Sequence, residues 1–283
     1  MVASLFLRLV ARITAFNIKT WSLSPIRTQE KQFKYLIKRA KSTSFGLDHN
    51  FQEITSYKDF VKNVPVRKYE GIKPYIERVK RGERNILWPG KPIYFARTSG
   101  TTSGSKYIPI TKESLKNHLN GAKNAILNYV AETKKTSFIK GKFIFIQGSP
   151  LLDKISEISI GRLSGISAHH IPFYMQSKML PSWETNIIED WESKLERIID
   201  ETIDKDMTII SGIPSWVQMY FEKIVEKKQK KIGTIFQNFK LFIYGGVNYK
   251  PYEKKFKSLI GRKIDSIELF PASEGFYAFQ DKQ

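Results

Sequence analysis

One short segment of the chain concentrates residue types that bind phosphate groups. It combines two glycines, several hydroxyl side chains and a closing lysine, in the order Thr98-Ser99-Gly100-Thr101-Thr102-Ser103-Gly104-Ser105-Lys106. Glycines let the backbone turn and bring its N–H groups close to an anion, hydroxyl groups donate to phosphate oxygens, and a lysine supplies positive charge. The sequence therefore predicts a phosphate loop. The alternative is a plain polar hairpin between Phe95 and Tyr107.

The segment is not a Walker phosphate loop. That motif has four residues between its glycines and places Lys and then Ser or Thr directly after the second glycine. Here three residues separate Gly100 from Gly104, Ser105 precedes Lys106, and Tyr107 stands where the magnesium-binding hydroxyl would be. The spacing therefore disfavours a kinase or GTPase of that class.

Apolar runs on both sides of this segment indicate the elements that must position it. Short strands are predicted at 93–96, 107–110, 143–146, 207–210, 241–244 and 266–270. Amphipathic helices are predicted from residue 112, over 184–203, from Pro214, and over 252–259. Continuous apolar strands separated by amphipathic helices indicate a parallel sheet that is covered by helices on both faces.

Ligands of such sheets bind beyond the carboxyl ends of the strands. Glycine-, serine- or proline-containing turns follow three of the predicted strands, at Thr98, Gly245 and Pro271. We therefore expect the functional site at these three ends. The pair Gly245-Gly246 has a second explanation, because a tight strand-to-helix corner also requires glycine.

Composition and charge exclude several kinds of site. The chain has no cysteine, which excludes disulfides, thiolate zinc sites and a cysteine nucleophile. The net charge of +20 would suit nucleic acid or an anionic membrane. However, the lysines are spread along the chain, the densest cluster (227–231) lies where a helix should end, and no nucleic-acid-binding signature accompanies them. We expect a solvated basic surface, with no specific nucleic-acid partner.

The N-terminal run, residues 1–16, is apolar but contains Arg8 and Arg12. A secretory segment should be free of such charges, and a membrane-spanning helix needs about 20 apolar residues. We expect an amphipathic helix that docks on the core, with weak membrane association as the alternative. The chain should therefore have no transmembrane segment and be cytoplasmic.

The segment from Thr98 to Lys106 resembles the Ser/Thr/Gly-rich phosphate loop of the adenylate-forming superfamily of acyl-CoA synthetases, luciferases and peptide-synthetase adenylation domains. Within that superfamily the chain is most similar to the auxin-responsive Gretchen Hagen family of acyl-acid amido synthetases, especially its bacterial members. The similarity extends over most of the chain, in the runs Phe45-Gly46 with His49, Val64-Pro65-Val66, Asn85 to Pro89, Ser211 to Trp216 and Pro271 to Phe276.

The resemblance implies an α/β fold with mostly parallel sheets flanked by helices, like the large N-terminal domain of adenylate-forming enzymes and incomplete at its C-terminal side. Residues 1–90 would be a helical segment that packs on the core, and residues 91–283 the nucleotide-binding core. The family pattern continues beyond Glu274 with a ribose-binding aspartate, a hinge and a small closing domain. This sequence contains none of them, so we expect the chain alone to be an inactive fragment.

The resemblance also implies roles for three segments. The loop residues 98–104 and Lys106 would bind the phosphates of ATP, with Lys106 catalytic. The turn formed by Gly245, Gly246 and Val247 would lie against adenine. In the run Phe270-Pro271-Ala272-Ser273-Glu274, the aromatic ring would pack near adenine, the hydroxyl would approach the α-phosphate, and Glu274 would hold Mg²⁺. Phe270 replaces the usual tyrosine, so stacking is kept and the phenol hydroxyl is absent.

The implied reaction is the activation of a small carboxylic acid by ATP and the transfer of the acyl group to an amine, which the family implies is an amino acid. The competing functions are a non-catalytic nucleotide- or acyl-binding remnant and, third, a basic nucleic-acid-binding protein. Retention of Lys106 and Glu274 favours the enzyme. Of the four histidines, His118 could face an acyl pocket or be an ordinary satisfied or exposed residue, and His169-His170 could line a binding loop. Their spacing does not indicate a metal site.

Overall fold

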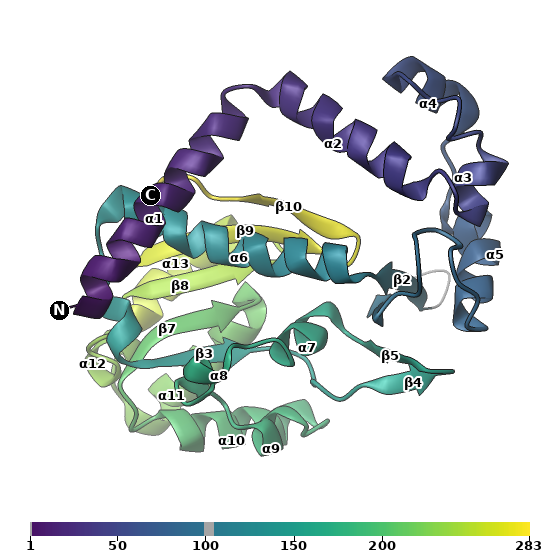
Figure 1. Cartoon of the computed structure of the whole chain (residues 1–283). Helices are drawn as coiled ribbons and strands as arrows, with labels where there is room; N and C mark the ends of the chain where they lie inside the picture. The colour runs from purple at the N-terminus through teal and green to yellow at the C-terminus, as the bar shows by residue number, and fades with distance from the viewer. Residues whose placement is uncertain (1, 99–104) are drawn as a thin grey trace. The chain divides into compact units, whose positions relative to one another are not determined.

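The computed structural model describes residues 2–98 and 105–283 (Figure 1). Contacts divide the chain into two compact units. Unit 1 consists of Met1–Ala15, Asn117–Leu151 and Arg162–Gln283, and unit 2 of Phe16–Lys116 and Leu152–Gly161. These bounds differ from the expected division into residues 1–90 and 91–283, which stays a prediction.

Unit 1 is built on a six-stranded sheet with the strand order β10-β9-β8-β7-β3-β6. Its strands are β3 (Lys142–Ile146), β6 (Met179–Leu180), β7 (Met207–Gly212), β8 (Leu241–Gly245), β9 (Asp265–Ala272) and β10 (Gly275–Phe279). Every neighbouring pair is parallel except β10 with β9, which is antiparallel. The predicted parallel sheet is therefore confirmed, with one antiparallel strand added at its edge.

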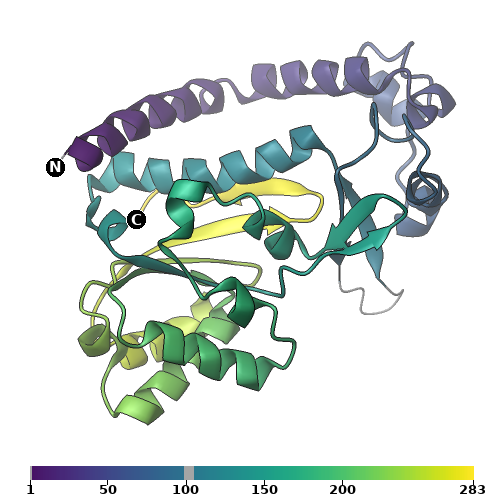
Figure 2. The same cartoon turned by 60° about the horizontal axis from the view of Figure 1, so that its bottom comes forward.

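Helices cover both faces of this sheet (Figures 1 and 2). Side chains alternate along a strand, so Leu241 and Ile243 of β8 pack on one face with the unit 1 parts of α1 (Val2–Ser22) and α6 (Lys112–Thr133). Phe242 and Tyr244 belong to the buried cluster on the other face. That cluster includes α10 (Trp191–Thr202), α11 (Pro214–Lys228) and α13 (Lys250–Ile260). The α/β fold with helices on both faces is confirmed.

The single helix expected over residues 184–203 is wrong. The chain forms two helices instead, α9 (Trp183–Asn186) and α10 (Trp191–Thr202). The Asp190 side chain accepts a hydrogen bond from the Ser193 N–H at 2.8 Å, which starts a new helix at that point. The buried Lys194 ammonium donates to the Asn186 carbonyl at 2.7 Å and so satisfies an acceptor at the end of α9.

The last strand is longer than expected and is followed by another. The prediction ended the strand at Phe270, whereas β9 continues to Ala272 and then pairs with β10 in a hairpin. Pro271 is tolerated because β8 pairs with β9 only as far as Leu269, so the missing N–H of Pro271 removes no bond to β8. Ala272 pairs with Gly275, which leaves Ser273 and Glu274 as the two-residue turn of the hairpin.

Unit 2 combines helices with a four-stranded sheet of order β2-β1-β5-β4. Its helices are α2 (Pro25–Ala40), α3 (Ser44–Asp48), α4 (Tyr57–Asn63) and α5 (Tyr69–Lys80), and its strands are β1 (Tyr94–Thr98), β2 (Lys106–Ile110), β4 (Asp153–Ile155) and β5 (Ile158–Gly161). Strands β1 and β5 are parallel and the other pairs are antiparallel.

Short helices complete unit 1, namely η1 (Ser137–Lys140), α7 (Leu163–Ala168), α8 (Phe173–Gln176) and α12 (Ile232–Ile235). Among the helices in the described part of the chain, none is both long enough and apolar enough to span a membrane. This includes α1, whose 21 residues contain Arg8 and Arg12. The expected cytoplasmic location stays a prediction.

Candidate nucleotide site

The predicted phosphate loop connects β1 to β2 in unit 2. Residues 99–104 lie outside the described residues, so the structure shows the two ends of the loop. Thr98, the last residue of β1, pairs with Lys106, the first residue of β2, in an antiparallel ladder. Strand pairing therefore closes the loop at its base and fixes where Lys106 begins. This arrangement agrees with both interpretations of the segment, a phosphate loop and a plain polar hairpin.

Tyr69 in the first turn of α5 supports the base of this hairpin. The backbone N–H of Tyr107 donates to the Tyr69 hydroxyl at 2.9 Å. The Lys106 ammonium lies over the ring of Tyr69, 5.7 Å from the ring centroid. No carboxylate among the described residues forms an ion pair with Lys106. A half-buried cation that is held by a ring and not neutralised can bind an anion.

The predicted adenine turn follows β8 in unit 1, and the fold itself requires both of its glycines. A Cβ atom on Gly245 would lie 2.4 Å from the carbonyl oxygen of Leu269, so only glycine allows β8 and β9 to approach this closely. Gly246 has a φ of +85°, which side-chain-bearing residues rarely adopt. The corner explanation therefore accounts for the glycines without a ligand. The two glycines leave bare backbone at the carboxyl end of a central strand, and an adenine contact would require the same bare backbone.

The second predicted segment lies beside this turn. Gly245 pairs with Leu269, so Phe270 and Pro271 continue from the strand position next to the glycines. The Phe270 ring is 59% exposed and lies 5.4 Å from the ring of Tyr277. The structure thus brings two of the three predicted segments together within unit 1. The third, the phosphate loop, belongs to unit 2.

Ser273 and Glu274 form the turn of the β9–β10 hairpin, and Glu274 is exposed. No cluster of three or more His, Asp or Glu side chains able to hold a metal ion exists among the described residues. Mg²⁺ commonly binds through one or two carboxylates together with substrate phosphates, and a single exposed glutamate fits that kind of site.

His118 differs from both ordinary interpretations of a histidine. It is only 5% exposed, and neither ring nitrogen has a hydrogen-bond partner among the described residues. Burial lowers the pKa of His118, so the imidazole is neutral near pH 7. One helical turn further along α6, the ring of Phe276 lies against Gly121. Sequence alone does not reveal this packing, because it joins residues far apart in the chain.

His169, in contrast, is a satisfied structural residue. Its Nε2 atom bonds to the Pro150 carbonyl at 2.8 Å, and its ring meets the ring of Trp183 edge to face with centroids 5.1 Å apart. Burial lowers the pKa of the neighbouring His170, with a smaller contribution from His169. These contacts give His169 a packing role, and a binding-loop role for the pair stays a prediction.

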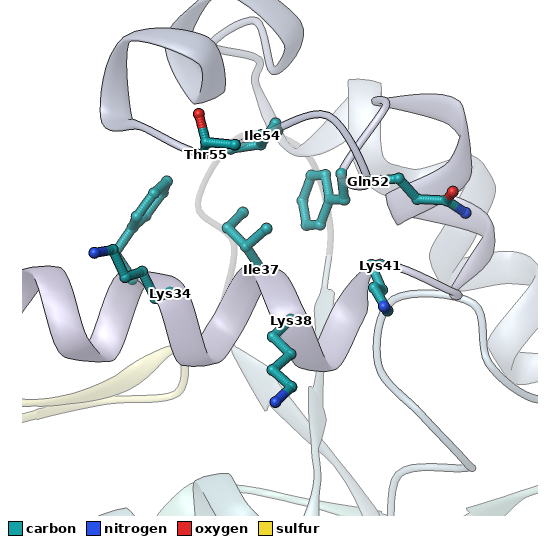
Figure 3. Close-up of a pocket in the computed structure, with 9 residues that line it drawn as sticks. Lys34, Ile37, Lys38, Lys41, Gln52, Ile54 and Thr55 are labelled. Atoms are coloured by element: carbon teal, nitrogen blue, oxygen red, sulfur yellow. The ribbon is translucent and has the colours of Figure 1, made fainter.

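Unit 2 also contains an open pocket of about 550 Å³ between α2 and the segment that follows α3 (Figure 3). Its apolar floor is formed by Phe33, Ile37, Phe51 and Ile54, and its rim by Lys34, Lys38, Lys41, Gln52 and Thr55. None of the residues predicted to bind nucleotide lines this pocket. The location of the nucleotide site at the strand ends stays a prediction.

Parts of this chain are similar in sequence to known proteins. Residues 16–150 match the GH3 family N-terminal domain. Over 63 residues the chain is 44% identical to the indole-3-acetic acid-amido synthetase GH3.15 of Arabidopsis thaliana, a match that covers 22% of this chain and 11% of that protein. Over 140 residues it is 25% identical to the jasmonoyl–L-amino acid synthetase JAR4 of Nicotiana attenuata, covering 48% of this chain and 23% of that protein. The matches show that part of this chain is similar to GH3 amido synthetases.

Solved structures agree with the GH3 fold. The GH3.15 acyl acid amido synthetase superposes with a TM-score of 0.70 at 12% identity, covering 93% of this chain and 56% of that chain. An open conformation of 2-hydroxyisobutyryl-CoA ligase superposes with a TM-score of 0.54 at 11% identity, covering 87% of this chain and 53% of that chain. At these identities the likeness shows the fold alone, and it is the fold of adenylate-forming enzymes.

This chain therefore spans about half the length of the solved GH3 structure that it matches. The GH3 segment at residues 16–150 contains the predicted phosphate loop, whereas the adenine turn and Glu274 lie beyond it. The curated relatives described above are plant proteins, so the expected place among bacterial GH3 members is not borne out.

Proposed function

We propose that this chain carries the nucleotide-binding part of an ATP-dependent amido synthetase, which activates a small carboxylic acid as an acyl-adenylate and transfers the acyl group to an amine. The observation that carries the proposal is the position of the loop from Thr98 to Lys106. It lies inside the segment that matches the GH3 family, at a strand end of an adenylate-forming fold. The names of the relatives suggest acids such as indole-3-acetic acid and an amino acid as the amine.

In the first step, a carboxylate oxygen of the acid forms a bond to the α-phosphorus of ATP while the bond from that phosphorus to the bridging oxygen breaks and pyrophosphate leaves. The acid is already ionised at neutral pH, so no general base is needed. Two anions must instead be held in line against their repulsion. Lys106 has a charge that no described carboxylate neutralises, and Tyr69 fixes the strand that carries it.

The adenine ring would lie at the β8 and β9 ends of unit 1. Gly245 and Gly246 offer bare backbone, Val247 after them has an exposed apolar side chain, and Phe270 offers an exposed aromatic ring. Pro271 and Ala272 continue the same strand and shape this end of the sheet. Stacking on Phe270 requires only a π face, so the absence of a phenol hydroxyl does not remove it.

Glu274 would hold Mg²⁺ together with phosphate oxygens, and Ser273 in the same turn would donate to the α-phosphate. When bound, the metal supplies positive charge that offsets the triphosphate. The protein's contribution is a two-residue turn that fixes both side chains at a defined end of the β9–β10 hairpin.

In the second step, the amine attacks the carbonyl carbon of the acyl-adenylate, the bond from that carbon to the phosphate oxygen breaks, AMP leaves, and the nitrogen loses a proton. The acid must be held by apolar surface and by few polar groups. We assign His118 of α6, which is neutral, buried and without a described partner, to the acid-binding part of the site.

The test is pyrophosphate exchange by the full-length protein against a panel of carboxylic acids, including indole-3-acetic and jasmonic acids. Exchange that depends on an added acid supports the proposal. Calorimetric ATP binding without exchange for any acid would favour the non-catalytic remnant. Filter binding of nucleic acid over a series of salt concentrations checks the third candidate, since phosphate contacts give a steep salt dependence.

A further inference from the structure

The first helix exposes an apolar stripe on the side that faces away from the core. Leu7, Val10 and Ala11 of α1 pack in the apolar cluster that contains α6 and one face of the unit 1 sheet, and the Ser4 and Thr136 hydroxyls are hydrogen-bonded at 2.6 Å. The opposite side carries five large side chains, each more than half exposed: Val2 (81%), Leu5 (72%), Phe6 (67%), Leu9 (56%) and Ile13 (55%).

These five residues recur at helical spacing and so form one continuous strip along the helix. Single exposed apolar side chains are common on protein surfaces, but a strip of this length marks an interaction surface. The inner side of α1 packs against the core, so the strip is held in place with its side chains exposed.

Positive charge runs along one edge of this stripe. At 3.6 residues per turn, Arg8 and Arg12 fall between the packed side of α1 and the apolar stripe. Neither arginine forms an ion pair with a described residue. The first acidic residue of the chain is Glu30, so α1 itself contains no carboxylate.

We propose that the exposed stripe of α1 docks on an anionic lipid surface, with its apolar side chains in the headgroup region and Arg8 and Arg12 on lipid phosphates. A helix with a large apolar stripe and basic flanks lies in the plane of such an interface. Anionic lipids complement the arginines and the net charge of +20. A second copy of the chain would bring the same arginines and no acidic residue from this helix. The helix does not cross the bilayer, since its inner side is occupied by the core.

Vesicle co-sedimentation of the full-length protein tests this. Vesicles of phosphatidylcholine alone are compared with vesicles that contain about 30% phosphatidylserine, at low and high salt. We expect binding to the anionic vesicles that weakens with salt. Leu5→Ser/Leu9→Ser should lower the affinity by about tenfold or more per substitution, because each removes an apolar side chain from the interface. The matched control Val66→Ser/Leu151→Ser changes two other exposed apolar residues and should bind like wild type.

The charge contribution has its own pair of variants. Arg8→Gln/Arg12→Gln should weaken binding by about fivefold per arginine and flatten the salt dependence. Lys230→Gln/Lys254→Gln removes the same net charge elsewhere on unit 1 and should change binding little. All substituted positions are exposed, and unchanged thermal unfolding confirms that each variant folds.

Three results would overturn the proposal. One is a lack of binding to anionic vesicles. Another is equal binding to neutral and anionic vesicles. The last is a dimer, detected by sedimentation velocity in wild type, that Leu5→Ser/Leu9→Ser converts to monomer, since the stripe would then be an interface between copies.

Discussion

The contact between Gly121 of α6 and Phe276 of β10 allows a sharp test of how unit 1 is packed. A Cβ atom on Gly121 would lie 2.4 Å from both Cγ and Cδ1 of Phe276 and 2.8 Å from its Cδ2. Since Cγ is the root of the ring, a rotation of the ring cannot relieve this overlap. Gly121→Ala therefore requires Phe276 to turn about its Cα–Cβ bond, or β10 or α6 to shift.

Two effects of opposite sign decide the result of Gly121→Ala. Replacing glycine by alanine inside a helix stabilises it by about 1 kcal/mol. Overpacking a well-filled contact costs about 1–3 kcal/mol. We expect overpacking to dominate, because the atoms displaced belong to the rigid part of the ring. The free energy of unfolding should fall by about 1 kcal/mol.

A double-mutant cycle separates the two effects. Urea unfolding is followed by circular dichroism for wild type, Gly121→Ala, Phe276→Ala and the double variant. Removing the ring removes the overlap, so in the Phe276→Ala background Gly121→Ala should stabilise by about 1 kcal/mol. The sign of the glycine substitution thus reverses between the two backgrounds. If Gly121→Ala stabilises both backgrounds equally, the ring does not lie against α6.

The other predictions concern the candidate site and one buried lysine. Lys106→Ala should reduce kcat/KM for pyrophosphate exchange by an amount corresponding to about 2–4 kcal/mol with the fold intact. The control Lys116→Ala, at an exposed position, should leave kcat/KM unchanged. If kcat/KM of Lys106→Ala equals that of wild type, Lys106 does not bind the phosphates. Glu274→Gln should raise the Mg²⁺ concentration for half-maximal adenylation about tenfold or more, since the carboxylate charge is lost. The control Glu184→Gln should titrate like wild type. If Glu274→Gln also titrates like wild type, Glu274 is a surface residue without a metal role. Burial, with a smaller effect of a nearby arginine, lowers the pKa of Lys194 to about 8. Between pH 8 and about 10.5 the Lys194 amine is therefore protonated in the unfolded chain but not in the folded one. The free energy of unfolding should rise with pH in that window by on the order of 2 kcal/mol in wild type. It should not rise in Lys194→Met.

The sequence is most informative about the centre of the unit 1 sheet. Buried parallel strands are continuous apolar runs, so 143–146, 207–210 and 241–244 could be located from composition alone. Pro214 correctly marked the start of α11, because proline fits the first turn of a helix. These features are local, and local patterns are sufficient to predict them.

The errors arise where caps, turns or tertiary contacts decide the structure, because apolar periodicity does not show them. Periodicity gave one helix over 184–203, but the cap of Asp190 and the ammonium of Lys194 stabilise a break that has no apolar signature. Strand β10 was missed because its pairing with β9 depends on a turn at Ser273 and Glu274. Tyr69 supports the β1–β2 hairpin from a helix far upstream, and no sequence pattern near Tyr69 predicts that contact.

Each of the two units is built from separate segments of the chain, which affects how they fold during synthesis. Unit 1 takes its first residues from Met1–Ala15 and its last from the C-terminal stretch, while unit 2 receives β4 and β5 only after residue 151. During synthesis, neither unit can be completed when residue 116 leaves the ribosome, because each still lacks strands encoded later. Pairing that spans so much sequence is slow to form and exposes unpaired strand edges in the meantime. The segment 16–150 is thus a unit of sequence similarity that coincides with neither compact unit. Excising it for expression would leave β1 without β5, and the remaining chain without α6.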